Sequence, residues 1–175
     1  MRVVAGELRG RRIQSPEGLD TRPTTDRVRE ATFNALASQD RLDGARIADL
    51  FAGTGAMGIE ALSRGAVHCR FVERDRRALQ VLRDNLAALG LAARSTVVMA
   101  DAAVDSASMP PVDLVLADPP YDFEGWADLL TRLPCDFVVA ESGRSLTVPD
   151  GWATVREKRY GRTFVAFLER AGELP

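Results

Sequence analysis

The sequence predicts an α/β fold in which helices cover both faces of an open, mostly parallel β-sheet. From Ala45 onward, short apolar runs typical of buried strands alternate with helical patterns, as in a doubly wound sheet. A glycine-rich segment follows the first apolar run, at the place where such sheets bind nucleotides. The last two runs are separated only by a short turn at Gly161, which predicts a closing antiparallel hairpin.

A small extension precedes the sheet. Glycines within residues 2–14 predict a β-hairpin or an extended arm, followed by a loop. A helix is then expected to begin with a cap at one of residues 24–26 and to run to about residue 38. Its Val28, Phe33 and Leu36 are expected to face the core.

The alternating part contains seven predicted strands and two predicted helices. The strands cover residues 47–51, 67–72, 96–99, 112–117, 137–140, 154–160 and 163–168, and the helices cover residues 56–64 and 75–89. Leucines of the second helix recur at helical spacing, so this stripe is interpreted as core packing. In a doubly wound sheet of order 3-2-1-4-5, strands 1 and 4 flank the crevice that binds ligands.

Composition restricts the classes of function. The chain has 175 residues, is 46% hydrophobic and carries a net charge of −2. A sizeable core is therefore expected, and a contact with nucleic acid must come from a local patch. The first residues and the longest apolar runs fit neither a signal peptide nor a membrane span, which favours a cytoplasmic protein.

The cysteines and the histidine suggest no metal chemistry. Cys69 and Cys135 lie in apolar runs without metal-ligand spacing and are expected to be buried thiols of a reduced compartment. His68 is the single histidine of the chain, which excludes a histidine-pair metal site. We interpret it as a residue at a strand edge, although it could also serve as a lone general base.

Arginine is concentrated near the N-terminus. The cluster comprises Arg2, Arg9, Arg11, Arg12, Arg22 and Arg27, together with Arg29. One interpretation is a solvated arm, since almost every basic residue of the chain is arginine. The interpretation we favour is an extension that grips phosphates, because guanidinium groups match phosphate geometry. Removal of residues 1–20 would then weaken RNA binding and leave the fold and cofactor binding intact.

The glycine-rich segment runs from Asp49 to Gly58 and connects a strand to a helix. Gly53 and Gly55 allow close approach of a ligand to the backbone, and Gly58 allows the helix to pack on the strand. An acidic residue, Glu73, follows the second strand, where ribose hydroxyls are bound in nucleotide-binding folds. The same glycines also fit an NAD enzyme, but a carboxylate at Asp49 would repel a pyrophosphate.

A second motif follows the fourth strand and consists of Asp118, Pro119, Pro120 and Tyr121. The prolines lack N–H groups and stiffen the chain, so a carboxylate, a backbone carbonyl and an aromatic ring converge. This set suits a planar molecule with an exocyclic amino group. The alternative is a tight strand-to-loop turn without chemistry. Asp101 ends the third strand and could contact the cofactor or merely cap the next segment.

Together these motifs resemble class I S-adenosylmethionine-dependent methyltransferases that act on exocyclic amines. The arm, residues 22–30 and the turn at 160–163 narrow the resemblance to the RsmD family. It implies a Rossmann-like sheet of order 3-2-1-4-5-7-6 and methylation of N2 of guanine 966 in 16S ribosomal RNA. It covers nearly the whole chain, but residues 122–134 carry no recognisable signature.

The resemblance also assigns roles to residues. Residues 1–40 would be the RNA-binding extension and residues 41–175 the methyltransferase domain. The catalytic residues would be Asp118, Pro119, Pro120 and Tyr121. The residues that contact S-adenosylmethionine would be Asp49, Phe51, Gly53, Gly55, Glu73, Asp101 and Ala102. The residues that contact RNA would be Arg2, Arg9, Arg11, Arg12, Arg22 and Arg27. The expected partner is 16S RNA in the assembling small subunit, with a monomeric enzyme and neither metal nor membrane.

Three alternatives remain at this point. A DNA adenine-N6 methyltransferase shares both motifs, although it usually needs a larger insertion that reads the target. An NAD-dependent oxidoreductase would need a substrate domain and gives the Asp118 motif no task. A catalytically silent RNA-binding module would not need that motif either.

Overall fold

The computed structural model describes residues 1–15 and 26–172 and contains a seven-stranded mixed sheet of order β3-β2-β1-β4-β5-β7-β6. The strands are β1 (Arg46–Leu50), β2 (His68–Glu73), β3 (Ser95–Met99), β4 (Leu114–Ala117), β5 (Phe137–Ser142), β6 (Trp152–Tyr160) and β7 (Thr163–Arg170). Strands β1 to β5 pair in parallel, and β6 and β7 close the sheet as an antiparallel hairpin. The predicted fold class and strand order are confirmed.

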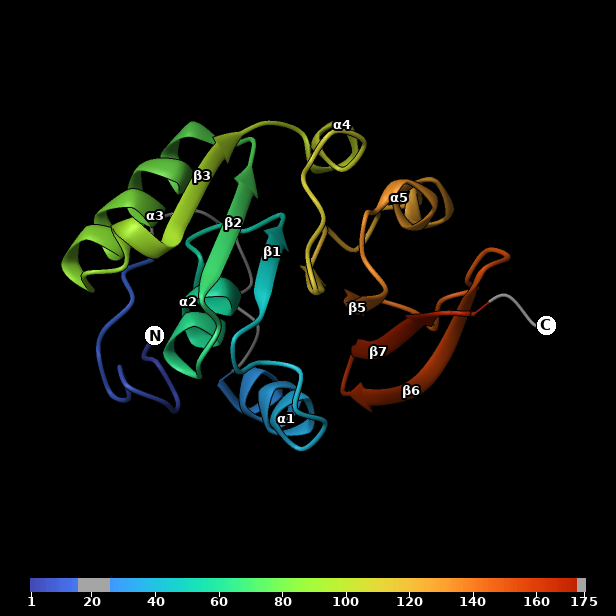
Figure 1. Cartoon of the computed structure of the whole chain (residues 1–175), viewed down its shortest axis with the longest axis horizontal. Helices are drawn as coiled ribbons and strands as arrows, with labels where there is room; N and C mark the ends of the chain where they lie inside the picture. Colours follow the sequence, from blue (N-terminus) through green and yellow to red (C-terminus); the bar gives the residue numbers. More distant parts are fainter. Residues whose placement is uncertain (16–25, 173–175) are drawn as a thin grey trace.

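Helices cover both faces of this sheet. They are α1 (Asp26–Ala37), α2 (Ala56–Ser63), α3 (Arg76–Ala88), α4 (Ala102–Asp105) and α5 (Trp126–Arg132), with a 3-10 turn at Ala92–Arg94. Figure 1 shows α1 and α2 on one side of the sheet and α4 and α5 on the other. No helix in residues 1–15 and 26–172 is long and apolar enough to cross a membrane.

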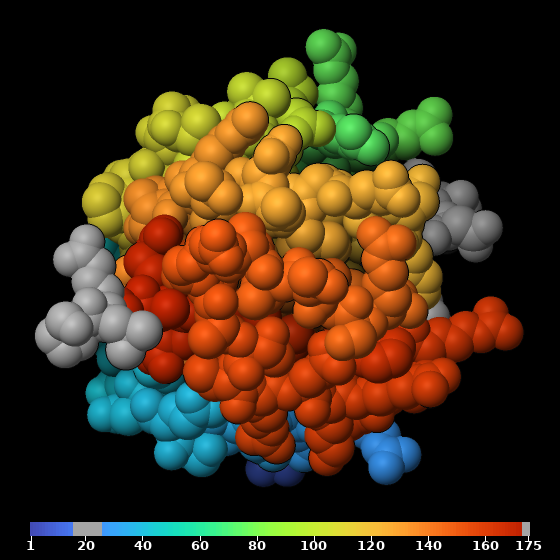
Figure 2. Space-filling view, turned by 90° about the vertical axis from the view of Figure 1, so that its right-hand side faces the viewer, coloured from blue at the N-terminus to red at the C-terminus, as the bar shows by residue number. Residues whose placement is uncertain are grey.

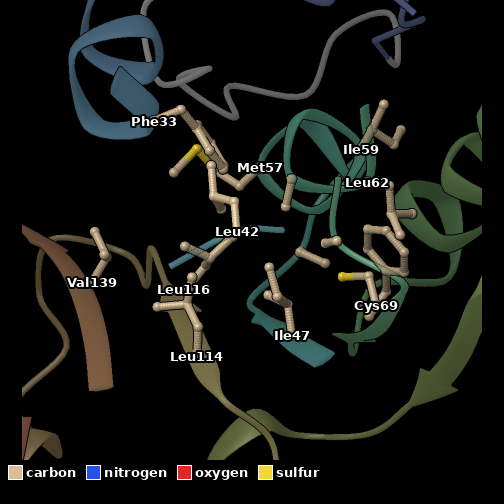
Figure 3. Close-up of a cluster of buried hydrophobic side chains, with 14 of the residues drawn as sticks. Phe33, Leu42, Ile47, Met57, Ile59, Leu62, Cys69, Leu114, Leu116 and Val139 are labelled. Carbon is tan, nitrogen blue, oxygen red and sulfur yellow. The ribbon is translucent and has the colours of Figure 1, made fainter. Parts of the chain in front are cut away.

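Two apolar clusters hold these layers together. The larger lies between the sheet and helices α1, α2 and α3, and Figure 3 shows part of it around Phe33, Ile47 and Leu116. The smaller lies under α4 and α5 on the opposite face. Gly58 allows α2 to lie directly on β2, since a Cβ atom there would come within 2.3 Å of the Phe71 ring. The packing role predicted for this glycine is confirmed.

Two short helices were not predicted from the sequence. Helix α4 has four residues, too few for a periodic pattern to be recognised. Helix α5 has seven residues and lies in the stretch without a recognisable signature. Its buried Trp126, Leu129 and Leu130 follow helical spacing, but the glycine at its N-cap and its short length make that pattern ambiguous.

The structure also describes the start of α1, the single histidine and the two cysteines. Asp26 begins α1, whereas the alternative caps Thr24 and Thr25 lie outside the described residues. His68 lies on β2 beside Thr96, which agrees with its interpretation as a strand residue. Cys69 and Cys135 are buried free thiols, and burial raises the pKa of the Cys135 thiol to about 12.

The N-terminal arm folds back on itself and docks on the body of the protein. Residues Arg2 and Arg12 form an antiparallel bridge, and the Val3 N–H donates to the Arg11 carbonyl at 3.0 Å. Val3 and Ile13 are buried in the larger apolar cluster. The predicted hairpin-like arm is therefore present, and the burial of Val3 and Ile13 argues against the expectation that the fold is independent of residues 1–20.

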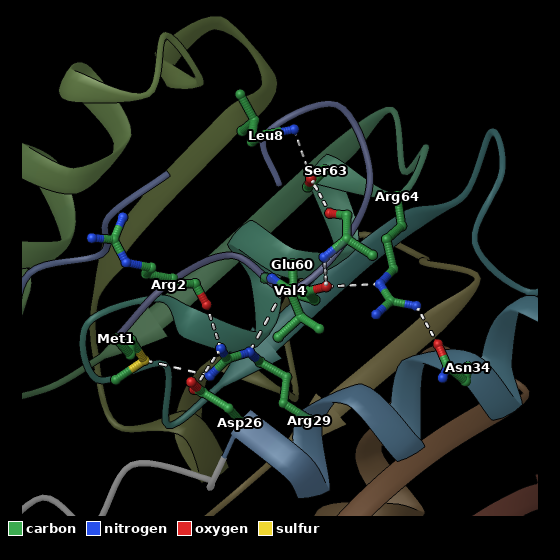
Figure 4. Close-up of polar contacts among 12 residues, drawn as sticks. Met1, Arg2, Val4, Leu8, Asp26, Arg29, Asn34, Glu60, Ser63 and Arg64 are labelled. Atoms are coloured by element: carbon green, nitrogen blue, oxygen red, sulfur yellow. Dashed lines mark hydrogen bonds and ion pairs between the residues drawn. The ribbon is translucent and has the colours of Figure 1, made fainter. Parts of the chain in front are cut away.

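A buried polar cluster fastens this arm to α2 (Figure 4). The Glu60 carboxylate is fully buried and accepts from the N–H groups of Val4 at 2.8 Å and Ala5 at 3.0 Å. It also pairs with Arg64 at 2.7 Å and with Arg29 at 3.6 Å. One carboxylate thus joins the arm, helix α1 and helix α2.

Candidate active site

A cavity of about 490 Å³ opens at the carboxyl ends of β1 and β4, in the size range of small-molecule sites. The register pairs Leu50 with Ala117, so the segments that follow these strands leave the sheet side by side. The lining residues are Met1, Ser15, Asp49, Phe51, Ala52, Gly53, Thr54, Ala56, Met57, Val72, Glu73, Arg74, Ala100, Ala102, Asp118, Pro119, Pro120, Tyr121 and Glu141. The two sequence motifs therefore share one cavity.

The glycine loop forms the first wall. Phe51 has φ of 62°, Gly53 of 53° and Gly55 of 85°, all in the left-handed region. Positive φ is unusual for phenylalanine and marks strained backbone of the kind found at ligand sites. A Cβ atom on Gly53 would meet nothing within 4 Å, whereas one on Gly55 would collide with Leu82. Gly53 therefore borders open space, and Gly55 serves the packing of the loop on α3.

Asp49 lies at the base of this wall. Its side chain is buried, and one carboxylate oxygen accepts from the Gly58 N–H at 2.8 Å. Burial raises the pKa of Asp49 well above its ordinary value, and the negative charges of Asp118 and Glu73 add to the rise. A cationic group in the cavity would relieve this electrostatic cost.

Glu73 connects the end of β2 to the glycine loop. One carboxylate oxygen accepts from the Gly53 N–H at 2.8 Å, and the other accepts from the N–H groups of Arg74 and Asp75, each at 2.8 Å. Because the carboxylate is fixed by three backbone donors, its position in the cavity is defined before a ligand arrives.

The second wall is the turn that follows β4. Pro119 is buried, Pro120 is exposed, and the Phe123 N–H donates to the Pro120 carbonyl at 2.9 Å. The Tyr121 ring is 44% exposed, and its hydroxyl lies 2.7 Å from the Thr163 hydroxyl on β7. The turn therefore holds an exposed aromatic ring beside a partly exposed carboxylate, Asp118.

Two predicted cofactor residues lie outside the lining of the cavity. Gly55 is buried in packing, and Asp101 caps α4 by accepting from the Ala103 N–H at 2.9 Å. Asp101 also pairs with Arg74 at 3.4 Å. Its capping role is thus present, and its neighbour Ala102 does line the cavity.

Sequence reasoning missed other lining residues. Glu141 is buried on β5 and directly follows Ala140, which pairs with Ala117 of β4. A carboxylate at the end of an apolar strand next to β4 was the available signal. Met1 and Ser15 reach the cavity only because the arm docks there, and no local pattern reveals this.

The predicted RNA-binding arginines lie elsewhere. Arg2, Arg9, Arg11, Arg12 and Arg27 are exposed and do not line the cavity, and Arg22 lies outside the described residues. Two of them contact the protein itself, since Arg2 donates to the Gly10 carbonyl at 2.7 Å and Arg11 to the Ala88 carbonyl at 2.9 Å. Within the described ranges, no group of three or more acidic, histidine or cysteine residues is arranged to hold a metal.

Comparisons with known proteins agree with this geometry. The family described as Conserved hypothetical protein 95 matches residues 1–169. Ribosomal RNA small subunit methyltransferase D of Escherichia coli K12 is 36% identical, covering 99% of this chain and 91% of its own length. Its namesake in Haemophilus influenzae is 32% identical, with coverages of 92% and 89%.

A solved structure extends the likeness to three dimensions. The protein yhhF from Escherichia coli is 37% identical, covers 99% of each chain and superimposes with a TM-score of 0.86. The family match spans the arm as well as the sheet. The chain therefore belongs to the Conserved hypothetical protein 95 family, which is the RsmD family that its motifs resemble.

Proposed function

We propose that this protein transfers a methyl group from S-adenosylmethionine to the exocyclic N2 of a guanine in 16S ribosomal RNA. The observation that carries the proposal is the shared cavity, which is lined both by the glycine loop and by residues 118–121. The relatives named for ribosomal RNA methylation support the substrate class. Guanine 966 is the position that the family resemblance suggests.

S-adenosylmethionine is the cofactor, and the residues of the first wall fit it. The cavity contains the carboxylates of Asp49, Glu73, Asp118 and Glu141, an environment that favours an ammonium and a sulfonium group over a pyrophosphate. Gly53 leaves room for close backbone approach, and Glu73 stands where ribose hydroxyls would bind. When bound, the cofactor supplies an electrophilic methyl group.

The second wall of the cavity positions the guanine amino group for methyl transfer. The lone pair of guanine N2 is delocalised into the ring, so this nitrogen is a poor nucleophile. Asp118 and the Pro119 carbonyl accept hydrogen bonds from its two N–H groups and so favour a pyramidal nitrogen. As the methyl group bonds to this nitrogen, S-adenosylhomocysteine is released and the Asp118 carboxylate takes up the proton that the nitrogen loses. Tyr121 stacks on the extruded base, an interaction worth about 1–3 kcal/mol. Fixing both reactants in this geometry contributes roughly 7–11 kcal/mol to lowering the barrier.

Residues 1–40 are proposed to form the part that holds RNA around the target, with residues 41–175 as the methyltransferase domain. The exposed guanidinium groups of Arg9, Arg12 and Arg27 are suited to phosphates. The substrate is proposed to be RNA in the assembling small subunit, and the enzyme to act as a monomer.

The test is methyl transfer from labelled S-adenosylmethionine to small-subunit particles isolated from cells that lack this methylation. Digestion of the product to nucleosides should yield N2-methylguanosine. Methyladenosine in a DNA substrate would instead identify the DNA adenine-N6 alternative. Binding of NAD without S-adenosylhomocysteine would identify an oxidoreductase, and cofactor binding without transfer to any RNA would overturn the proposed reaction.

A further inference from the structure

A second hollow lies beside Tyr121 and has no role in the function described so far. It measures about 370 Å³ and is lined by Tyr121, Gly143, Arg144, Arg159, Arg162 and Phe164. Of the residues that the structure describes, Tyr121 is the one that lines both this hollow and the main cavity. Tyr121 therefore lies between two differently charged sites. Among the described residues, the main cavity is lined by four carboxylates and one arginine, and the hollow is lined by three arginines.

Strand pairing builds this hollow from segments that are distant in sequence. Ser142, at the end of β5, pairs with Phe164 of β7, and Phe164 pairs with Arg159 of β6. Gly143 and Arg144 continue directly from β5, so they leave the sheet next to the β6–β7 turn that carries Arg162. Figure 2 shows this last hairpin, in orange-red, exposed across a broad face of the molecule.

Contacts within the hollow fix its shape. Ser142 Oγ donates to the Arg144 carbonyl, which shapes the turn after β5. A Cβ atom on Gly143 would come 3.3 Å from Tyr121 Cγ, so the glycine backbone packs closely against the tyrosine ring. The Tyr121 hydroxyl is held by Thr163, which is 1% exposed. The ring is thus supported from the side of the hollow.

The charges of the hollow favour an anion. Arg159 lies over the Phe164 ring at 5.3 Å, and its Nε donates to the Gly161 carbonyl at 2.8 Å, which holds its guanidinium in place. Within residues 1–15 and 26–172, no carboxylate forms an ion pair with Arg144 or Arg162. The acidic Glu157 of β6 is instead bound by Ser145 at 2.9 Å.

From this arrangement we infer that the hollow binds RNA phosphates next to the target nucleotide, with the base on the other side of the Tyr121 ring. Guanidinium groups bind phosphates through paired hydrogen bonds, and such contacts fix the register of the nucleic acid. The inference rests on the proposed function, and it assigns the phosphates nearest the reacting base to the β5–β7 end of the sheet.

The experiment compares R144Q/R162Q with the wild-type protein and with R83Q/R132Q. The control removes the same charge from exposed positions on α3 and α5, away from both cavities. RNA affinity is measured at several salt concentrations without cofactor, using the ribosomal RNA segment around the target. Two lost phosphate contacts should lower the slope of log affinity against log salt by about 1.4 for single-stranded RNA.

In transfer assays, KM for RNA should rise about tenfold near physiological salt, whereas kcat and affinity for S-adenosylhomocysteine should stay within about twofold. The single variant R144Q should lower the slope by about 0.7. An R144K/R162K variant, which keeps the charge, should recover most of the slope. Slopes equal to those of the control would overturn the inference, whether or not inorganic phosphate binds the protein.

This design separates the two proposals. If R144Q/R162Q lowers the slope by about 1.4 but wild-type protein transfers no methyl group, the proposed reaction fails and the phosphate site stands. If wild-type protein methylates guanine and R144Q/R162Q behaves like its control, the reaction stands and the phosphate site fails.

Discussion

The two walls of the main cavity differ in the backbone that surrounds their carboxylates. On the glycine-loop wall, Asp49 accepts from one backbone N–H and Glu73 from three. On the opposite wall, Asp118 is followed by Pro119 and Pro120, which have no N–H groups that could donate to it. In the first wall the backbone donates to the carboxylates, whereas in the second wall the two residues after the carboxylate have no N–H to donate.

Under the proposed function, this difference separates a wall that binds the cofactor from a wall that positions the substrate. Carboxylates that backbone donors hold in place suit a ligand that always binds in the same way. A carboxylate next to two prolines suits a substrate that brings its own N–H groups. Substitutions in one wall should therefore change either cofactor binding or methyl transfer and leave the other unchanged.

The largest effect is expected for Asp118→Ala. Loss of the acceptor for the amine should lower kcat at least about 1000-fold. Affinity for S-adenosylhomocysteine, measured by calorimetry, should change by less than about twofold. The exposed Asp128 on α5 supplies the control variant, Asp128→Ala, which should keep full activity. Comparable losses of turnover and of cofactor affinity would contradict the division between the two walls.

Glu60→Ala tests whether the contact between the arm and α2 stabilises the helix that follows the glycine loop. Glu60 lies on α2, one turn after Met57, which lines the cavity. Removing its carboxylate leaves two arm N–H groups without their acceptor and leaves the buried Arg29 with Asp26 as its remaining acidic partner among the described residues, at a cost of about 3–5 kcal/mol.

Thermal unfolding should therefore show a markedly lower Tm for Glu60→Ala. The exposed Glu30 of α1 provides a matched control, and Glu30→Ala should unfold like the wild-type protein. Equal Tm values for the two variants would show that the arm contributes no stability to α2. Such a result would also restore the expectation that residues 1–20 are dispensable for folding.

Asp49→Asn should separate stability from binding within the glycine-loop wall. The amide oxygen can still accept from the Gly58 N–H, but the buried charge is gone. Because the pKa of Asp49 is raised in the folded protein, its contribution to stability is full below the ordinary value of 3.8 and is lost as pH rises through the raised pKa. At neutral pH the variant should therefore be more stable than the wild-type protein.

The same substitution should weaken cofactor binding by about 10- to 100-fold, since a hydrogen bond to a charged group is lost. Unfolding at several pH values and calorimetric titration with S-adenosylhomocysteine measure the two effects. Unchanged affinity would mean that Asp49 only shapes the loop. A stability gain that does not diminish at low pH would show that the buried charge is not its cause.

Much of the site could be predicted because its residues lie in two contiguous motifs. A strand followed by a glycine loop and a strand followed by two prolines define their own local structure, and the parallel sheet then brings their ends together. Glu141 was not predicted as a lining residue because its position at the cavity depends on the register between β4 and β5. Met1 depends on the docking of the arm, which no periodic pattern encodes.

The arginine cluster shows that sequence composition does not distinguish buried arginines from exposed ones. Arg29 belongs to the same run of charges as Arg27, yet it is fully buried and donates to the Arg2 carbonyl at 2.6 Å. Composition cannot separate an arginine that fastens the fold from one that meets solvent, since both look alike in sequence. The distinction depends on which face of α1 packs on α2 and on the presence of Glu60 beneath it.

The smallest effect is expected for Tyr121→Phe, at the residue where the main cavity and the hollow meet. Tyr121→Phe removes the hydroxyl that contacts Thr163 but keeps the ring, so KM for RNA should rise about fivefold, the value of one hydrogen bond. Tyr121→Ala also removes the stacking surface and should raise KM further, by about 5- to 150-fold. Equal effects of the two variants would mean that the contact with Thr163 matters and the ring does not. The tyrosine would then only brace the turn after β4, and the base would have to be held by the acceptors of Asp118 and Pro119 alone.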